Sequence, residues 1–368
     1  MQETTCDIFD WLHEWWPKTT YDLASSNVPG VTYSELKKLT GFTIPGDLDL
    51  GSNVQDGAPI LKEFLAKRYK VDTDMVVTST GGSEGNFLVF GSQLNQGDEI
   101  VCEQPGYSPM WISPRMLRVN VVPWYRQYKD GFQLDLEALK ELVTKRTKLV
   151  AMTNLHNPSH VAVPQSQIKA AAEIAGDRGA KLLIDEMFLD AAFKPQRSAA
   201  GMDGVIITAS VSKIYGLGGI RTGWIVADKG TARQCQLIKN LTTGSSPYMG
   251  EYMNGFAMAK ARPALLKRFL SLARRNHAIA SRWVRKNSDI IEWVTPAGGL
   301  LSYPKYRANM DSVKLCTNIA KKYKLLLSPG TYFGMDGHFR MTYRLPEAKL
   351  KEAFEVLEIA LREEITGA

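Results

Sequence analysis

The chain has 368 residues, a formal net charge of +7 and 44% hydrophobic residues. This length exceeds the size at which a single hydrophobic core usually divides, so we expect one large and one smaller domain. The charge is modest, and no long block of lysine or arginine occurs. These features argue against a nucleic-acid-binding protein and are compatible with a phosphorylated or anionic ligand. No apolar run in the sequence is long enough to span a membrane.

The cysteines and histidines predict neither a disulfide framework nor a metal site. Cys6, Cys102, Cys235 and Cys316 lie far apart and form no Cys-x-x-Cys pair. The five histidines lack the spacing of a metal-binding motif. Reduced thiols are typical of cytoplasmic proteins, which is the location we expect. The first residues are acidic and aromatic, so we also expect no signal peptide.

The first 60 residues predict short elements joined by turns. The segment 27–30 predicts a turn, and 41–57, rich in Gly, Pro, Asp and Asn, predicts a loop. Residues 32–39 predict a short helix, because a threonine at its start is followed three residues later by a glutamate, as in a capping box. Pro59 begins the next predicted helix, in which apolar residues recur at helical spacing.

From residue 75 to residue 227 strands and helices alternate. Short apolar runs predict strands over 75–77, 99–102, 119–124, 149–153, 181–184, 205–208 and 224–227. Helical patterns lie between them, over 84–94, 136–143 and 164–178. This alternation predicts an α/β domain with three layers, in which helices cover both faces of a mainly parallel sheet. Ligands bind such sheets beyond the carboxyl ends of the strands.

The remainder of the chain predicts long helices and then a smaller α+β domain. Residues 250–260 and 263–286 read as helices, and from about residue 287 short strands alternate with helices over 312–323 and 347–362. Chain termini often lie close together. We therefore expect a large domain over 45–274 and a small domain formed by 1–44 with 275–368.

The stretch 210–224 carries the strongest chemical signal. It contains Ser210, Ser212, Lys213 and Arg221 among several glycines, between two apolar strands. A lysine at the edge of a buried sheet is costly to keep charged, and forming a Schiff base with a carbonyl neutralises it. The serines and the arginine together donate to a phosphate. Pyridoxal phosphate combines both groups, whereas the alternative is a glycine-rich surface turn.

Two further strand ends carry polar residues. Asp185 follows the strand over 181–184 and is a candidate partner for a cationic ring nitrogen, although a helix cap or a structural ion pair explains it equally well. Asn157 follows the strand over 149–153 and is a candidate donor to a phenolic oxygen of the cofactor. The alternative for Asn157 is a simple Asn-Pro turn.

The turn before the helix over 84–94 allows two interpretations. Gly82 and Ser83 lie at a glycine-rich helix N-terminus, where backbone amides bind anions such as phosphate. The same residues also match Gly-x-Ser-x-Gly, the nucleophile elbow of serine hydrolases. In that alternative Ser83 is the nucleophile, and His338 with Asp289 or Asp311 completes a triad.

Two other residues have candidate roles in ligand binding. Tyr107 follows the strand over 99–102 and is placed to stack on a planar ring, with Trp111 as a second candidate; either residue is otherwise a core aromatic. Arg340 lies in an apolar strand-like segment, and a buried arginine requires an anion. That anion is a substrate carboxylate or a structural aspartate or glutamate.

Together these motifs resemble the class I/II aminotransferases, which are fold-type-I pyridoxal-phosphate enzymes. The stretch Ser210–Gly223 resembles the family's Ser-x-Ser-Lys-x-x-Gly-x-x-Gly-x-Arg-x-Gly signature, and Asn157-Pro158-Ser159 and Asp185-Glu186 resemble two further motifs. Gly82 with Ser83, Tyr107 and Arg340 also fall in the family's order along the chain. The resemblance covers roughly residues 45–345.

The resemblance implies a role for each of these residues. Lys213 would form the internal aldimine and carry a proton, Asp185 would pair with the pyridine nitrogen, and Tyr107 would stack on the ring. Asn157 would contact the phenolic oxygen, and Arg340 with Asn157 would bind the substrate. The phosphate would be held by Gly82, Ser83, Ser210, Ser212 and Arg221. The family also implies a homodimer.

The implied reaction moves an amino group from an α-amino acid to a 2-oxo acid by a ping-pong route. A lyase or cyclase that performs β/γ-elimination or a cyclising replacement, as in capreomycidine-synthase-like enzymes, is the alternative on the same scaffold. Two departures from the family pattern stand out: His160 replaces a usual glycine, and Phe188 replaces a usual tyrosine. No second arginine is assignable to the side chain of a dicarboxylic substrate.

Overall fold

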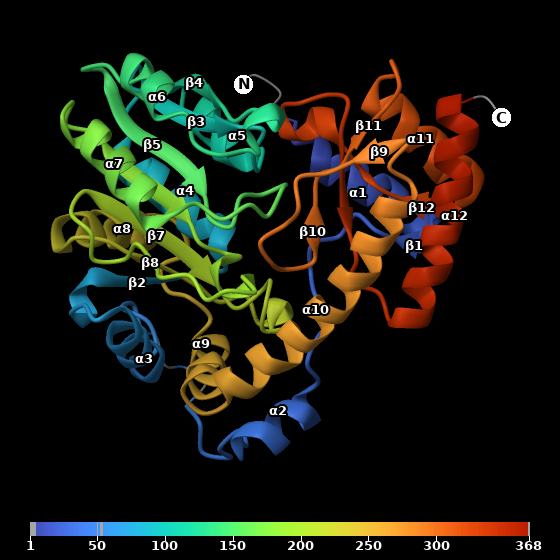
Figure 1. Ribbon diagram of the computed structural model, residues 1–368. Coiled ribbons are helices and arrows are strands. Elements are labelled where there is room, and N and C mark those ends of the chain that lie inside the picture. Colours follow the sequence, from blue (N-terminus) through green and yellow to red (C-terminus); the bar gives the residue numbers. More distant parts are fainter. Residues whose placement is uncertain (1–4, 50, 52–53, 367–368) are drawn as a thin grey trace.

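The computed structural model describes residues 5–49, 51 and 54–366 (Figure 1). A seven-stranded sheet with the order β2-β8-β7-β6-β5-β3-β4 forms the centre of its larger part. The strands are β2 (Val76–Ser79), β3 (Glu99–Gln104), β4 (Asn120–Tyr125), β5 (Thr147–Thr153), β6 (Lys181–Asp185), β7 (Val205–Ser210) and β8 (Gly223–Val226). Strand β8 is antiparallel to both of its neighbours, and the other pairs are parallel. The predicted mainly parallel sheet is confirmed.

Helices cover both faces of this sheet. Successive side chains of a strand point to opposite faces, so Leu183 packs into one core while Leu182 and Ile184 pack into the other. Helices α4 (Gly82–Gln93), α5 (Pro109–Met116) and α8 (Lys229–Thr242) contribute to the first core. Helices α3 (Pro59–Tyr69), α6 (Leu136–Leu142) and α7 (Gln165–Gly176) contribute to the second. The three-layer α/β/α architecture is therefore confirmed.

A long helix, α10 (Arg262–Lys286), leads from the sheet to the smaller part of the molecule (Figure 1). This part combines helices with short strands: α11 (Ser312–Tyr323), α12 (Glu347–Thr366), β9 (Ile291–Glu292), β10 (Leu301–Ser302), β11 (Lys305–Tyr306), β12 (Leu325–Leu326), β13 (Ser328–Pro329) and β14 (Phe339–Thr342). The N-terminal strand β1 (Tyr21–Asp22) pairs in parallel with β12. The N-terminal segment thus lies beside the C-terminal part, and the limits 45–274 and 1–44 with 275–368 remain our proposed division.

Several local elements depart from the sequence-based expectations. Helix α1 (Asp7–Trp15) was not predicted, and neither was α5, because Pro114 inside it is a helix-breaking signal. The predicted helix over 250–260 is α9 (Tyr248–Phe256) followed by one π-helical turn. The predicted turn over 27–30 is wrong, because these residues form no turn. Helix α2 (Tyr33–Thr40) has the capping box expected for it.

The described ranges contain no helix that is long and apolar enough to cross a membrane. Within the same ranges, no group of three or more His, Cys, Asp or Glu side chains is arranged to hold a metal ion. The cysteines are free thiols, and Cys102, Cys235 and Cys316 are buried.

Candidate active site

A cavity of about 330 Å³ lies at the carboxyl ends of strands β5, β6 and β7. This is the edge at which ligands bind α/β sheets. Every predicted site residue except Arg340 lines the cavity: Gly82, Ser83, Tyr107, Asn157, Asp185, Ser210, Ser212, Lys213 and Arg221. Residues that are far apart in the sequence therefore converge on one space.

Lys213 follows β7 and is held by the N-terminal segment. Its Nζ donates hydrogen bonds to Ser26 Oγ at 2.9 Å and to Asn27 Oδ1 at 2.8 Å. Burial and the neighbouring Arg340 lower the pKa of the Lys213 amine to about 8, although Asp185 opposes the shift. A neutral amine, which is both a nucleophile and a base, is therefore accessible near neutral pH.

Asp185 ends strand β6 and is buried. Its Oδ2 accepts a hydrogen bond from Asn86 Nδ2 at 2.9 Å, and its Oδ1 accepts one from the backbone N–H of Met187 at 2.9 Å. Burial raises the pKa of the Asp185 carboxyl, whereas these hydrogen bonds and the charge of Lys213 favour the ionised form. Asp185 is therefore placed to bind a cationic group in the cavity.

The other end of the cavity is an anion cradle. Helix α4 begins at Gly82, where the first backbone N–H groups have no partners within the helix. Gly81 has φ +84°, and a Cβ there would lie 2.5 Å from Arg221 Nη2, so glycine lets this turn approach the guanidinium. Ser212 Oγ is buried and has no hydrogen-bond partner. Arg221 donates to the carbonyl oxygens of Gly218 at 3.0 Å and Thr80 at 3.5 Å, and no carboxylate among the described residues forms a salt bridge with it.

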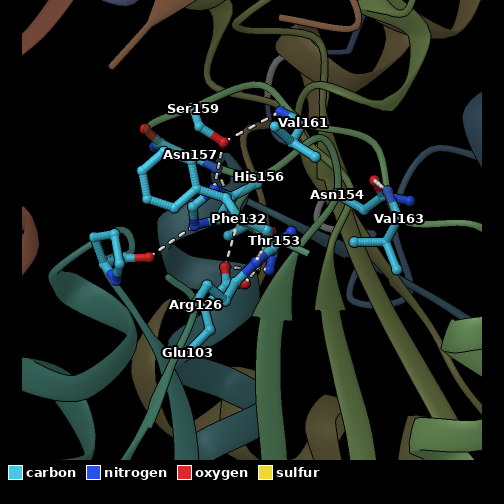
Figure 2. Close-up of polar contacts among 11 residues, drawn as sticks. Glu103, Arg126, Phe132, Thr153, Asn154, His156, Asn157, Ser159, Val161 and Val163 are labelled. Atoms are coloured by element: carbon cyan, nitrogen blue, oxygen red, sulfur yellow. Dashed lines mark hydrogen bonds and ion pairs between the residues drawn. The ribbon is translucent and has the colours of Figure 1, made fainter. Parts of the chain in front are cut away.

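A buried ion pair supports the Asn157 loop (Figure 2). Arg126 Nη1 lies 2.7 Å from Glu103 Oε2, and both side chains are almost fully inaccessible to solvent. Glu103 Oε1 accepts a hydrogen bond from Thr153 Oγ1 at 2.6 Å, and Thr153 Oγ1 accepts one from the Asn157 N–H at 2.9 Å. The contacts fix the backbone of Asn157 where β5 ends.

His156 connects the Asn157 loop to the loop that carries Tyr107. Its Nε2 lies 2.7 Å from the Pro105 carbonyl oxygen, and its Nδ1 lies 2.6 Å from Ser159 Oγ. A carbonyl only accepts, so Nε2 carries the proton and Nδ1 accepts from the serine hydroxyl. Burial lowers the pKa of His156 well below its ordinary value, which keeps the ring neutral. Burial also raises the pKa of Tyr107 to about 12.

Arg340 on β14 is buried beside the cavity. Its Nη1 donates to Asn157 Oδ1 at 3.3 Å and its Nη2 donates to the Ala24 carbonyl at 2.9 Å, whereas Nε has no partner. No carboxylate among the described residues forms a salt bridge with Arg340, so its positive charge is not neutralised by the protein. A substrate carboxylate fits this position better than the structural partner considered from the sequence.

His160 occupies the position where the family usually has glycine. It has φ +57°, a left-handed conformation that glycine adopts most easily. Its Nδ1 lies 3.0 Å from the Gly298 carbonyl, and its ring centroid lies 4.6 Å from that of Phe188. A Cβ on Gly299 would lie only 2.3 Å from His160 Nδ1. The loop accommodates the larger side chain because residue 299 is glycine.

The serine hydrolase hypothesis for Ser83 is wrong. His338 stacks on Tyr303 at 4.9 Å between ring centroids, and its Nδ1 lies 3.0 Å from the Asp336 carbonyl. Asp289 accepts from Arg362, and Asp311 caps helix α11. Both proposed acids therefore bind groups other than His338, and the triad is not formed.

Several cavity residues were not anticipated from the sequence: Phe9, Ser26, Asn27, Asn86, Thr153, Met187 and Gly218. Gly218 lies within the signature stretch but had no assigned role, and Phe9, Ser26 and Asn27 reach the cavity only through the fold. Trp111, the second stacking candidate, belongs to α5 and packs into the core on that face of the sheet.

Pyridoxal 5'-phosphate fits these residues. The unpartnered Ser212 hydroxyl, Arg221 and the α4 N-terminus suit its phosphate, Asp185 suits its ring nitrogen, and Lys213 lies between them.

Comparisons with known proteins agree with this geometry. A family model described as aminotransferase class I and II matches residues 50–357. Capreomycidine synthase from Streptomyces vinaceus is 27% identical over 357 residues, which cover 95% of this chain and 91% of that relative. A protein named probable aspartate/prephenate aminotransferase from Aquifex aeolicus is 27% identical over 342 residues, covering 83% of this chain and 82% of the relative.

Among solved structures, a PLP-dependent aminotransferase from Streptococcus suis matches with a TM-score of 0.89 and 25% identity, over 99% of each chain. The family model spans more than half of the chain. The chain therefore belongs to the class I and II aminotransferase family, and its cofactor is pyridoxal 5'-phosphate.

Proposed function

We propose that this enzyme is an aminotransferase that moves an amino group from an α-amino acid to a 2-oxo acid. The observation that carries the proposal is the Lys213 amine, which lies between the Asp185 carboxylate and the anion cradle. When bound, pyridoxal phosphate supplies a carbonyl that condenses with amines and a ring that accepts an electron pair.

Lys213 and the residues around it each have a distinct role in this reaction. Lys213 is the covalent anchor and, once released, holds the proton that moves from the substrate Cα. Asp185 keeps a negative charge beside the ring nitrogen, and Tyr107 forms one wall of the ring site. Asn157 would contact the phenolic oxygen of the bound cofactor. Its phosphate would be held by Gly82, Ser83, Ser210, Ser212 and Arg221.

Arg340 and Asn157 orient the substrate. The free Nε of Arg340 and its Nη1 contact with Asn157 support binding of an α-carboxylate at this position. Fixing the carboxylate fixes the Cα–H bond relative to Lys213, which is the positioning that proton transfer requires. The same arginine suits any α-amino acid, so it does not by itself select a side chain.

The purified enzyme should be yellow, and borohydride should fix the cofactor covalently to Lys213. Incubation with a panel of amino acids should release the matching 2-oxo acid in an amount equal to the enzyme while the visible band disappears. Addition of a second 2-oxo acid should then restore the band. A colourless protein that cannot be reconstituted would refute the cofactor assignment at this site.

A lyase or cyclase is the second candidate function, and the similarity to capreomycidine synthase over 95% of the chain favours it. The functions differ in the fate of the amino group. A transaminase leaves it on the enzyme and releases a 2-oxo acid, an eliminating lyase releases ammonia together with a 2-oxo acid, and a cyclase returns the amino group on the α-carbon of a cyclic product. Product analysis of single-turnover reactions separates these outcomes.

We also propose a homodimer in the cytoplasm, with domains over 45–274 and over 1–44 with 275–368. The free state of the cysteines and the family relationship support this proposal. Light scattering of the holoenzyme at low micromolar concentration should give twice the mass of the chain, and a monomer mass would contradict the dimer.

A further inference from the structure

Asn86 is a buried polar residue on helix α4, and the proposed reaction assigns it no role. Only 4% of its surface is exposed, and it lines the cavity beside Asp185. Burying an amide in an apolar core is unfavourable unless its donors and acceptors are satisfied. The residues that follow it on the helix, Leu88, Val89 and Phe90, are buried and apolar. The position therefore needs a specific explanation.

Asn86 forms a hydrogen-bonded bridge between two strands. Thr208 Oγ1 on β7 donates to Asn86 Oδ1 at 2.6 Å, and Asn86 Nδ2 donates to Asp185 Oδ2 at 2.9 Å. All three side chains are buried. Hydrogen bonds linked in series polarise one another, so each of these two bonds is stronger in a region of low dielectric constant.

The Asp185 carboxylate fixes the orientation of the Asn86 amide. An ionised carboxylate only accepts hydrogen bonds, so the side of the amide that faces Asp185 must be the NH₂ group. The opposite orientation would place two oxygens against each other and leave a buried carboxylate oxygen without its donor. Thr208 completes the arrangement because its hydroxyl donates to the remaining amide oxygen.

We infer that Asn86 and Thr208 are positioning residues that hold Asp185 ionised, so that the proton shared with the cofactor stays on the ring nitrogen. The inference rests on the proposed role of Asp185. The amide stabilises the carboxylate without adding a second positive charge, which would compete with the ring nitrogen. Loss of the amide raises the proton affinity of Asp185 and moves the shared proton toward the carboxyl group. The ring then accepts electrons less readily.

Asn86→Leu and Thr208→Val test this inference, because each replacement keeps a similar volume and removes the polar group. Ser92→Ala is the matched control on the same helix, since its hydroxyl bonds the Val89 carbonyl and Cys235 instead. Each holoenzyme is prepared with pyridoxal phosphate labelled with ¹⁵N in the ring. The ¹⁵N chemical shift then reports directly whether the ring nitrogen is protonated.

The wild-type enzyme and Ser92→Ala should show a protonated ring nitrogen. Asn86→Leu should shift the ¹⁵N signal toward the neutral pyridine and lower kcat about tenfold, as expected for losing a hydrogen bond to a charged group. Thr208→Val should cause a smaller shift in the same direction, with kcat lowered about threefold. KM for the amino acid should change less than kcat in both variants.

The double variant Asn86→Leu/Thr208→Val should resemble Asn86→Leu alone, because Thr208 acts through Asn86. An unchanged ¹⁵N signal in Asn86→Leu would overturn the inference. If that variant does not fold, an unchanged signal in Thr208→Val would overturn it instead. Asp185→Ala distinguishes the proposed role of Asp185 from the role of Asn86. If the ring nitrogen stays protonated in Asp185→Ala, the role of Asp185 itself is refuted. If the ring nitrogen loses its proton in Asp185→Ala but not in Asn86→Leu, only the role of the Asn86 bridge is refuted.

Discussion

The two ends of the cofactor cavity are built in opposite ways. At the Asp185 end, Asp185, Asn86 and Thr208 are buried, and each oxygen of the carboxylate already has a donor. At the phosphate end, Ser83 and Arg221 are exposed, and the Ser212 hydroxyl has no partner. The first end is complete within the protein, whereas the second is completed by the ligand. We therefore expect the first to control chemistry and the second to control affinity.

Lys213→Ala should have the largest effect, because Lys213 lies between the two ends and serves both steps. Loss of the nucleophile and proton carrier should lower kcat by about a thousandfold or more. Both ends remain intact, so the variant should still bind pyridoxal phosphate without a covalent link. Borohydride treatment followed by mass spectrometry checks the linkage, and full activity in this variant would contradict the assignment.

Asp185→Ala should lower kcat about a hundredfold, because the ring loses the anion that stabilises its protonated nitrogen. The dissociation constant of the cofactor should rise much less, since the phosphate contacts are unchanged. Turnover at saturating cofactor and a binding titration measure the two effects separately. A variant that loses affinity but retains turnover would reverse the comparison.

Arg221→Ala should show the opposite pattern. Loss of one charged donor from the cradle should weaken cofactor binding about tenfold, while kcat at saturating cofactor stays within about threefold of wild type. Arg233→Ala, an exposed arginine on α8, serves as the control. Equal losses of affinity in both variants would mean that Arg221 acts only through the general charge of the protein.

The pH dependence of cofactor capture should report the Lys213 amine. Because burial lowers its pKa to about 8, the fraction of neutral amine rises tenfold per pH unit below that value and levels off above it. The rate at which the apoenzyme forms the covalent link should follow this curve in stopped-flow absorbance. Asn27→Leu removes an acceptor from the ammonium form, so its curve should move to lower pH.

Phe188→Tyr should produce the smallest change. A hydroxyl directed at the phenolic oxygen of the cofactor favours its ionised form, so the pKa of the visible band should fall by roughly one unit. A spectrophotometric titration of the holoenzyme measures this pKa. An unchanged titration would show that the ring beside His160 does not face the phenolic oxygen.

The sequence predicts most of the cavity because its residues follow strands, and parallel strands place their carboxyl ends at one edge. Lys213, Asp185 and Asn157 were identified in this way. Arg340 was identified from its charge in an apolar segment, and in the structure it donates a hydrogen bond to Asn157. These signals are local, so short stretches of sequence suffice to find them.

The remaining residues depend on contacts between distant segments. Asn86 sits inside a helix whose pattern predicts only a core, and its role follows from the strand that carries Thr208, 122 residues later. The sequence pattern predicts a turn over 27–30 for Asn27 and no role for Ser26, and their partner Lys213 lies more than 180 residues away. Nothing in either local pattern indicates these partners.

The pairing of β1 with β12 has a consequence for how the enzyme is made. Tyr21 pairs with Leu325, so the segment that brings Ser26 and Asn27 to Lys213 is anchored by a strand that is synthesised long after it. Domains generally fold from the N-terminus as the chain emerges from the ribosome, and such long-range pairing forms late. The parallel sheet can form early, but the lysine acquires its partners only after the C-terminal part has emerged. A nascent chain that does not yet include β12 therefore lacks the finished site, which delays capture of the reactive aldehyde until this strand is made.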